Sequence, residues 1–278
     1  AKLPKNLADK KHAEAFLESC KNATFKVADL QTKPAKKSPA PPFTTSTLQQ
    51  EASRKLGFPV AKTMLMAQKL YEAGLITYMR TDSLNLSADA KKDAAAAIIE
   101  NYGASYSHPR SFKTKSKGAQ EAHEAIRPTS MTMQEVSVDY DQDRLYSLIW
   151  KRTISSQMSD AQLERTNVKI SHSNSNKSFT ANGEVIKFEG FLKVYLEGTD
   201  SEDDEQDGML PKLVVNDALD VLNIKATERY TQAPYRYSEA ALVKQLEELG
   251  IGRPSTYAPT ISTIQRRGYV DKGNVDGI

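Results

Sequence analysis

Hydrophobic residues change their spacing several times along this chain. They recur at helical spacing over residues 8–20 and alternate with other residues over 24–30, which predicts a short helix followed by a strand. Residues 33–42 are rich in Pro, Lys and Ala and have no periodicity, so we expect a linker there. Helical patterns fill most of residues 43–163, and beyond Ala161 the period returns to two.

The helical block begins with two consecutive predicted helices. Ser46 and Gln49 have the spacing of a capping box for the first helix, which ends at Gly57. The second helix starts at Pro59 and ends at Gly74. Its predicted buried face consists of Val60, Met64, Ala67 and Tyr71.

Two more helices are expected in the same block. One is capped by Ser87 and runs to Tyr102, and the other runs from Asp141 to Met158, with Asp141 at its N-cap. The later helix carries its apolar face at Leu145, Leu148 and Ile149. Residues 103–120 are basic and polar, and we expect a mobile loop there.

The second half of the chain reads mainly as strands. Alternating patterns predict strands around 168–170, 179–186, 191–196 and 213–224. Asn182-Gly183 is a strong signal for a hairpin turn. The acidic run 197–208 is predicted to be a solvated loop without fixed structure.

Strands on both sides of a helical block indicate an α+β protein with several domains. We expect a β arch formed by residues 1–42 and 164–234, interrupted by an inserted helical domain at 43–163. Residues 235–278 would then begin a second helical domain.

A pattern of helix, Gly turn, helix, Gly stop and apolar strand occurs twice, at 56–76 and again at 249–270, where Tyr269-Val270 begins the strand. This recurrence predicts two winged-helix-like, helix-turn-helix units. Two unrelated helical hairpins that share capping glycines are the alternative.

Composition adds few constraints. Of the 278 residues 26% are charged and 39% hydrophobic, and a net charge of +3 does not by itself indicate a nucleic-acid binder. The single Cys20 excludes an internal disulfide and a Cys-rich zinc site, which fits a cytoplasmic protein. No apolar run in the sequence reaches membrane-spanning length, and we expect no signal peptide. Because the first residue is Ala, we expect a fragment of a longer protein.

Tyr78 and Arg80 are the strongest candidates for chemistry. Residues two apart in an extended segment share a face, so both side chains could reach one ligand. A phenol is a poor nucleophile at its ordinary pKa of about 10, and a guanidinium nearby would favour the phenolate and bind a phosphate. The pair therefore suits attack on a phosphodiester. A buried strand with a tyrosine at its tip is the structural alternative.

Asp139, Asp141 and Asp143 alternate along the chain in a way that could bind Mg²⁺. Acidic residues are also favoured at the start of a helix, where the dipole is positive. We therefore interpret these residues as the beginning of the helix at 141–158 and expect no metal site in this chain.

Three stretches, in this order, carry a family resemblance. They are Leu-Ile-Thr-Tyr-Met-Arg-Thr-Asp-Ser at 75–83, Glu-Ala-His-Glu-Ala-Ile-Arg-Pro at 121–128 and Leu-Gly-Ile-Gly-Arg-Pro-Ser-Thr-Tyr at 249–257. In the residues of these stretches and in their spacing, the chain resembles the type IA DNA topoisomerases, most closely the bacterial topoisomerase I group. The resemblance covers nearly the whole chain and is weakest over residues 1–40 and 198–210.

The resemblance implies roles for particular residues. Tyr78 would attack a DNA phosphorus and hold the 5′-phosphate, and Arg80 would bind the scissile phosphate. His123 would hydrogen-bond phosphate near the cleavage point, and Arg127 would either contact DNA or pair with Glu124 to hold its loop. Arg253, Ser255 and Thr256 lie at a predicted helix N-terminus, which is suited to phosphate but is also an ordinary N-cap. Arg267 matches a DNA-contacting arginine of the family.

The resemblance also implies cofactors and partners. The family's Mg²⁺ is bound by acidic residues of an N-terminal Toprim domain, and neither that domain nor the C-terminal zinc ribbons has a counterpart here. Expected partners are single-stranded and negatively supercoiled DNA and the remaining domains of the enzyme, with a location at the nucleoid. We expect an isomerase that breaks and reseals one strand without ATP, and expect the fragment alone to be inactive.

Two other interpretations stay open at this point. The chain could be a non-catalytic, winged-helix-like DNA-binding module with a structural tyrosine. A narrower alternative is a topoisomerase III or reverse gyrase, although the Thr-Tyr-Met-Arg wording and the lack of helicase sequence favour topoisomerase I.

Overall fold

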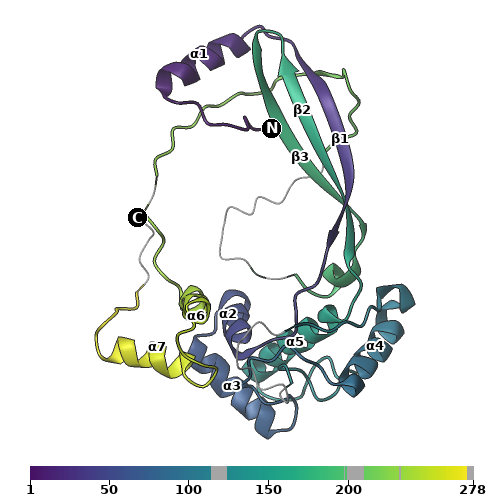
Figure 1. Ribbon diagram of the computed structural model, residues 1–278, viewed down its shortest axis with the longest axis vertical. Coiled ribbons are helices and arrows are strands. Elements are labelled where there is room, and N and C mark those ends of the chain that lie inside the picture. The colour runs from purple at the N-terminus through teal and green to yellow at the C-terminus, as the bar shows by residue number, and fades with distance from the viewer. Residues whose placement is uncertain (114–123, 197, 199–209, 232, 274–278) are drawn as a thin grey trace. The chain divides into compact units, whose positions relative to one another are not determined.

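The computed structural model describes residues 1–113, 124–196, 198, 210–231 and 233–273 (Figure 1). The chain divides into two compact units. One, which we call the sheet unit, comprises Ala1–Lys37, Ala161–Phe188 and Asp203–Ala233. The other, the helical unit, comprises Ser38–Asp160, Glu189–Glu202 and Pro234–Ile278. Helices and antiparallel strands are both present, as expected for an α+β protein.

The sheet unit is built on four antiparallel strands in the order β3-β2-β1-β4. They are β1 (Phe25–Lys37), β2 (Ala161–His172), β3 (Ser175–Phe188) and β4 (Ala218–Leu219). Helix α1 (Lys10–Cys20) begins at Asp9, whose side chain accepts a hydrogen bond from the His12 backbone N–H. The buried centre of this unit is formed by Phe16, Cys20 and Phe25.

Two expectations for the β region are wrong. Lys33–Lys37 belongs to β1 rather than to a linker, and it pairs with β2 through Ala161. Pro34 is tolerated in this strand because β1 pairs with β4 only at Phe25 and Lys26, so its other edge near Pro34 carries no strand among the described residues. The expected strand at 213–224 is reduced to the two residues of β4.

The hairpin turn also lies elsewhere than predicted. Asn182 and Gly183 are inside β3, where they pair with Asn167 and Thr166 of β2. The turn between β2 and β3 falls at 173–174. A local turn signal is overridden here because pairing with β2 continues on both sides of it.

The helical unit contains six α-helices and two 3₁₀ helices among its described residues. They are α2 (Thr45–Leu56), α3 (Val60–Glu72), α4 (Ala88–Tyr102), η1 (Ala104–Tyr106), α5 (Tyr140–Ser156), η2 (Gly190–Lys193), α6 (Glu239–Glu248) and α7 (Tyr257–Arg266). The predicted helix positions are confirmed, and Ser87 caps α4 as expected. Leu145, Leu148 and Ile149 are buried on α5.

Three details of these helices differ from the prediction. The capping box of α2 is formed by Thr44 and Thr47 rather than by Ser46 and Gln49, and Asp139 rather than Asp141 caps α5. On α3 the buried face is Val60, Thr63, Met66, Ala67 and Leu70, so Tyr71 faces outward. A period of 3.6 fixes which residues share a face but leaves the rotation of a short helix open by about one position.

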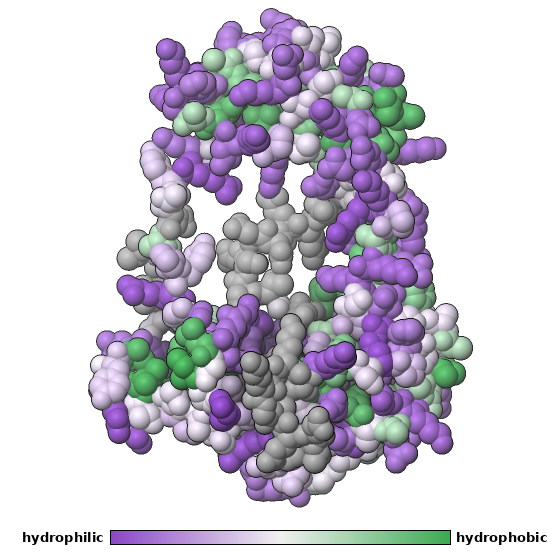
Figure 2. Space-filling view, viewed as in Figure 1, coloured by the Kyte–Doolittle hydropathy of each residue, from purple (hydrophilic) through white to green (hydrophobic). Residues whose placement is uncertain are grey.

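Helices α6 and α7 pack against α2 and α3 inside the helical unit. Val60, Val243, Tyr257 and Ile261 form the buried cluster between the two pairs. Two carboxylates of α6 add polar contacts: Ser46 Oγ donates to Glu247 (2.7 Å) and the Val60 backbone N–H donates to Glu239 (2.7 Å). Figure 2 shows hydrophobic side chains gathered over α6 and α7.

The strand expected after each helical pair is not formed. The segment after α3 makes a single bridge, between Ile76 and Pro128, and Tyr269-Val270 follows α7 without strand pairing among the described residues. The expected strand at 191–196 is instead the 3₁₀ helix η2 and the residues after it. A strand needs a longer run of paired backbone groups than these segments have among the described residues.

Candidate active site

The segment that carries Tyr78 leaves α3 through a tight reversal of the chain. Gly74 adopts a left-handed conformation (φ +71°) that favours glycine. Its N–H donates to the Tyr71 carbonyl oxygen (2.9 Å), and the Leu75 N–H donates to the Leu70 carbonyl oxygen (2.9 Å). These two bonds form a Schellman motif, which folds residues 75–78 back toward the end of α3.

Exposure alternates along the segment. The Tyr78 side chain is 45% exposed, Met79 is buried at 1% and Arg80 is exposed. Met79 therefore anchors the segment in the core while the residues on either side of it face outward. Among the described residues the Arg80 guanidinium has neither an ion pair nor a hydrogen bond, so its five donors are available to a ligand.

Thr45, the first residue of α2, holds the backbone on both sides of Arg80. Its hydroxyl donates to the Met79 carbonyl oxygen (2.7 Å) and accepts from the Thr81 N–H (2.9 Å). Its own backbone N–H donates to the Thr81 carbonyl oxygen (2.9 Å). Thr45 is completely buried, so these bonds are shielded from water. Sequence reasoning did not identify this residue, because a threonine near a helix start carries no signal of a contact so far along the chain.

A second anchor joins the segment to residues 125–127. The Thr77 hydroxyl donates to the Ala125 carbonyl oxygen (2.7 Å) and accepts from the Arg127 N–H (2.9 Å). The Thr77 N–H donates to the Arg127 carbonyl oxygen (2.9 Å). Thr77 thus fixes the backbone just before Tyr78, and Thr45 fixes it on either side of Arg80.

The Arg127 side chain is bound within the protein. It forms an ion pair with Glu124 (2.8 Å) and donates to the Pro128 carbonyl oxygen (3.0 Å). Glu124 also accepts from the Ser87 N–H (2.7 Å) at the start of α4. Burial acts to raise the pKa of the Glu124 carboxyl, but the hydrogen bonds from Arg127 and Ser87 outweigh it and hold this pKa below its ordinary value.

The rings of Tyr71 and Tyr78 are in contact. Their centroids lie 5.2 Å apart with an interplanar angle of 66°, which is an edge-to-face arrangement. Tyr71 belongs to the last turn of α3, so the reversal at Gly74 is what brings the two rings together.

The residues predicted to bind DNA are distributed over several segments. His123 lies outside the described residues, as do part of the expected loop at 103–120 and nearly all of the acidic run at 197–208. Arg253 and Ser255 are exposed in the turn between α6 and α7, and Arg267 is exposed at the end of α7. Thr256 precedes α7, but its hydroxyl accepts from the Arg253 N–H (2.7 Å) and makes no helix-capping bond.

Electrostatic coupling links the start of α7 to the Tyr78 segment. The pKa of Tyr257 is raised, first by burial and then by the negative charge of Glu247; Arg253 opposes this rise, and the charge of Asp82 adds to it. Asp82 follows Arg80 by two residues, and its charge is the smallest of the effects on Tyr257.

The three alternating aspartates have three different partners. Asp139 caps α5, Asp141 pairs with Lys62 (2.6 Å) and Asp143 accepts from the Val136 N–H (3.0 Å). Across the part of the chain that the structure describes, no three His, Cys, Asp or Glu side chains are grouped closely enough to hold a metal ion.

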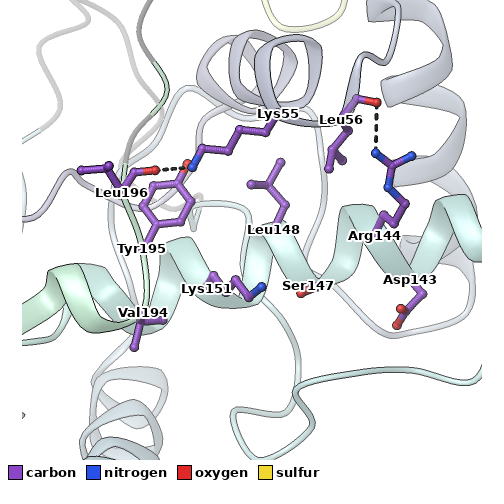
Figure 3. Close-up of a pocket in the computed structure, with 10 residues that line it drawn as sticks. All are labelled: Lys55, Leu56, Asp143, Arg144, Ser147, Leu148, Lys151, Val194, Tyr195 and Leu196. Atoms are coloured by element: carbon purple, nitrogen blue, oxygen red, sulfur yellow. Dashed lines mark hydrogen bonds between the residues drawn. The ribbon is translucent and has the colours of Figure 1, made fainter. Parts of the chain in front are cut away.

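A cavity of about 370 Å³ lies between the end of α2, α5 and residues 194–196 (Figure 3). Two of the cations in its wall are bound to backbone oxygens: Lys55 donates to Leu196, and Arg144 donates to Leu56 (3.2 Å). None of the predicted site residues lines this cavity. The candidate site therefore lies on the exposed Tyr78 segment and not in this cavity.

Among the described helices, none is both long enough and apolar enough to cross a lipid bilayer.

Comparisons with known proteins agree with the family resemblance. The sequence profile of a DNA topoisomerase family matches residues 1–276. The chain is 47% identical over 272 residues to DNA topoisomerase 1 of Zymomonas mobilis and 49% identical over 275 residues to that of Streptomyces coelicolor, in each case over 95% of this chain. The structure of full-length topoisomerase I from Thermotoga maritima matches 97% of the chain with a TM-score of 0.83 and 36% sequence identity.

The chain spans only part of these relatives. It corresponds to 22% of the Zymomonas protein, 29% of the Streptomyces protein and 45% of the Thermotoga chain.

Proposed function

This chain belongs to the bacterial DNA topoisomerase family, and from that premise we propose that it carries the nucleophile of a type IA enzyme that relaxes negatively supercoiled DNA. The nucleophile is the phenolic oxygen of Tyr78. The observation that carries this proposal is the outward-facing pair Tyr78 and Arg80, held on a backbone that Thr45 and Thr77 fix by buried and half-buried hydrogen bonds.

The proposed reaction exchanges one phosphoester bond for another. The Tyr78 oxygen forms a bond to phosphorus and the bond between phosphorus and the 3′-oxygen breaks. The phenolic proton is lost and the 3′-oxygen gains a proton, so the products are a 5′-phosphotyrosine and a free 3′-OH. Because the phosphoester is kept as a covalent intermediate, the reverse step reseals the strand without ATP.

Arg80 would stabilise the charge that develops on the phosphate during this exchange. A guanidinium can donate two parallel hydrogen bonds to phosphate oxygens. The lack of a partner for Arg80 among the described residues supports this role, because a guanidinium already paired with a carboxylate would have to break that pair first.

The remaining candidates would bind DNA on either side of the scissile phosphate. We propose contacts from Arg253, Ser255, Thr256 and Arg267, and their exposure supports the assignment. Arg127 would act by holding its loop through Glu124, unless DNA displaces that carboxylate. A phosphate contact from His123 stays a prediction of the sequence.

Mg²⁺, when bound in the full-length enzyme, would position the DNA ends for cleavage and religation. The described residues do not offer a cluster of acidic side chains suited to that ion, so we expect its ligands in parts of the relatives that this chain does not span. A polypeptide of these 278 residues should therefore bind single-stranded DNA weakly and leave a supercoiled plasmid unrelaxed in the presence of Mg²⁺. Turnover by this polypeptide would contradict that expectation.

Replacement of Tyr78 tests the central proposal. In the full-length protein, Tyr78→Phe should abolish the covalent protein–DNA adduct seen on denaturing gels while sparing DNA binding, because only the nucleophilic oxygen is lost. Tyr71→Phe, which removes a different exposed hydroxyl, is the matched control and should retain the adduct. An adduct that persists in Tyr78→Phe would refute the assignment. If neither the wild type nor Tyr78→Phe forms an adduct, the chain is a DNA-binding module instead.

Strand passage requires the break to open, and we propose that the sheet unit acts as the hinge. The expected observation is that crystals with different packings show different angles between the sheet unit and the helical unit. One fixed angle in every packing would count against the hinge.

A further inference from the structure

Tyr71 is a large aromatic residue that α3 keeps at its surface. The helix buries a continuous face that includes Ala67 and Leu70, and Tyr71 lies off that face with 41% of its side chain exposed. Its edge-to-face contact with the Tyr78 ring is the one ring contact, ion pair or side-chain hydrogen bond that Tyr71 makes among the described residues. Burial therefore does not explain why an aromatic residue occupies this position.

A local motif and a tertiary anchor together set the geometry of this contact. The Schellman motif at Gly74 sets the path from Tyr71 to Tyr78, and Thr77 fixes the backbone immediately before Tyr78. With both backbones fixed, the direction of the Tyr78 side chain still depends on its rotamer, and an exposed tyrosine can populate several. The Tyr71 ring is the neighbour that favours one of them.

We propose that Tyr71 is a positioning residue that holds the Tyr78 ring in the orientation required for attack on phosphorus. This inference rests on the proposed role of Tyr78 as nucleophile. An edge-to-face aromatic pair is strong enough to bias the rotamer population by about 2- to 12-fold. Rates of reactions between held groups depend steeply on geometry, so this bias appears in the rate of the chemical step and not in the affinity for DNA.

Three variants of Tyr71 separate the ring from its other properties. Tyr71→Phe keeps the ring and removes the hydroxyl, Tyr71→Leu keeps an apolar side chain without a ring, and Tyr71→Ala removes both. Leu65→Ala is the matched control, because Leu65 is also exposed (55%) on α3 and has no assigned role. Since both positions are exposed, we expect all four variants to fold with nearly unchanged melting temperatures.

The experiment is single-turnover formation of the covalent adduct by the full-length protein on a single-stranded oligonucleotide, measured over a range of protein concentrations. Tyr71→Ala and Tyr71→Leu should lower the maximal rate by about 2- to 12-fold at an unchanged half-saturating concentration. Tyr71→Phe should restore the wild-type rate, and Leu65→Ala should match the wild type.

Three results would overturn the inference: a wild-type rate in Tyr71→Ala, a rate for Tyr71→Phe as low as that of Tyr71→Ala, or a change confined to the half-saturating concentration. The last result would make Tyr71 a DNA contact instead. Failure of the proposed function is recognised separately, because the wild-type protein would then form no adduct or Tyr78→Phe would still form one.

Discussion

Thr45 has no reactive chemistry, yet it decides where Arg80 can point. Its hydroxyl and backbone N–H bind the peptide groups of Met79 and Thr81, which flank Arg80. Because these groups are buried, water cannot replace the bonds if the hydroxyl is removed. The position of a catalytic guanidinium would thus depend on a threonine at the start of α2.

Thr45→Val tests this clamp. The substitution keeps the shape of the side chain but leaves the Met79 carbonyl and the Thr81 N–H without their partner, at a cost of about 1–3 kcal/mol in the free energy of unfolding. Displacement of Arg80 should also slow adduct formation per folded molecule. Urea unfolding measures the first effect and single-turnover kinetics the second.

Two controls separate positioning from stability. Thr45→Ser retains the hydroxyl and should recover most of the rate. Thr153→Val removes another fully buried hydroxyl, one that bonds the Ile149 carbonyl oxygen in its own helix, and should lower stability without slowing the adduct. If Thr45→Val reacts as fast as the wild type, the clamp has no part in catalysis.

Glu124 gives the loop at 124–128 a pH dependence. Its pKa is lowered in the folded protein because the bonds from Arg127 and Ser87 outweigh the effect of burial. A carboxyl with a lowered folded pKa contributes stability above its unfolded pKa, about 4.5, and that contribution is lost as the pH falls through the folded value.

The corresponding prediction compares Glu124→Gln with the wild type. At pH 7 the variant should be less stable by about 1 kcal/mol, since one partly buried ion pair and its hydrogen bonds are weakened. The difference in stability should shrink as the pH is lowered below about 4.5, because the wild-type carboxyl then becomes protonated and loses its ion pair with Arg127. Thermal unfolding between pH 3 and pH 7 measures it, and a difference that stays constant to pH 3 would show that the charge is not responsible.

The sequence was sufficient to nominate Tyr78 and Arg80, because their spacing suits phosphate chemistry and residues 75–83 resemble the active-site segment of a known family. It could not reveal Thr45, whose partners are 34 and 36 residues away, or the contact of Tyr71 with Tyr78. The helical pattern even predicted that Tyr71 points inward. Side chains that position a nucleophile are defined by tertiary contacts, which periodicity does not record.

Among the elements, helices were predicted better than strands, whose existence in β1, β2 and β3 was predicted but whose bounds and turn were not. A helix satisfies its hydrogen bonds locally, so spacing and capping residues such as Ser87 identify it within a short window. A strand depends on a partner that is distant in sequence. Asn182-Gly183 has ideal turn chemistry, but β2 pairs with β3 straight through it, and Asn167 donates to Asn182 across the strands (2.6 Å).

Gly190 explains the failure of another predicted strand. It follows β3 with a left-handed conformation (φ +52°) and begins η2 at the point where a strand over 191–196 was expected. A Cβ atom at this position would lie 2.5 Å from the carbonyl oxygens of Ser159 and Asp160. Only glycine fits, and its conformation turns the chain out of the extended path.

Gly190→Ala should therefore be strongly destabilising. The strained φ costs about 1–2 kcal/mol, and the clash with two backbone oxygens adds to it. Gly57→Ala is the matched control, because Gly57 also has a positive φ (+67°) but open space around its Cβ position. In urea unfolding, Gly57→Ala should lose only the free energy that the strained conformation costs. Equal losses of free energy in the two variants would contradict the proposed clash.

On the scale of the whole molecule, the two units have separate cores. The sheet unit buries Phe16, Cys20 and Phe25 together, and the His172 ring stacks on Phe25 with a centroid distance of 5.3 Å. His172 is 4% exposed, and among the residues that the structure describes neither of its ring nitrogens has a hydrogen-bond partner. An aromatic cluster that contains unsatisfied polar atoms is less stable than its packing allows.

Separate cores predict separate responses to mutation. Phe16→Ala should lower the free energy of unfolding of the sheet unit by about 3–5 kcal/mol, which is typical when a large aromatic residue is removed from a core. His172→Phe should raise it by about 1 kcal/mol, because the unsatisfied ring nitrogens are removed. Hydrogen exchange should show faster exchange of β2 and β3 amides in Phe16→Ala, with α5 amides and the rate of adduct formation unchanged, because Tyr78 belongs to the helical unit. If α5 amides lose protection to the same extent, the two units unfold together. A hinge motion between them could then not rely on one unit loosening while the other stays folded.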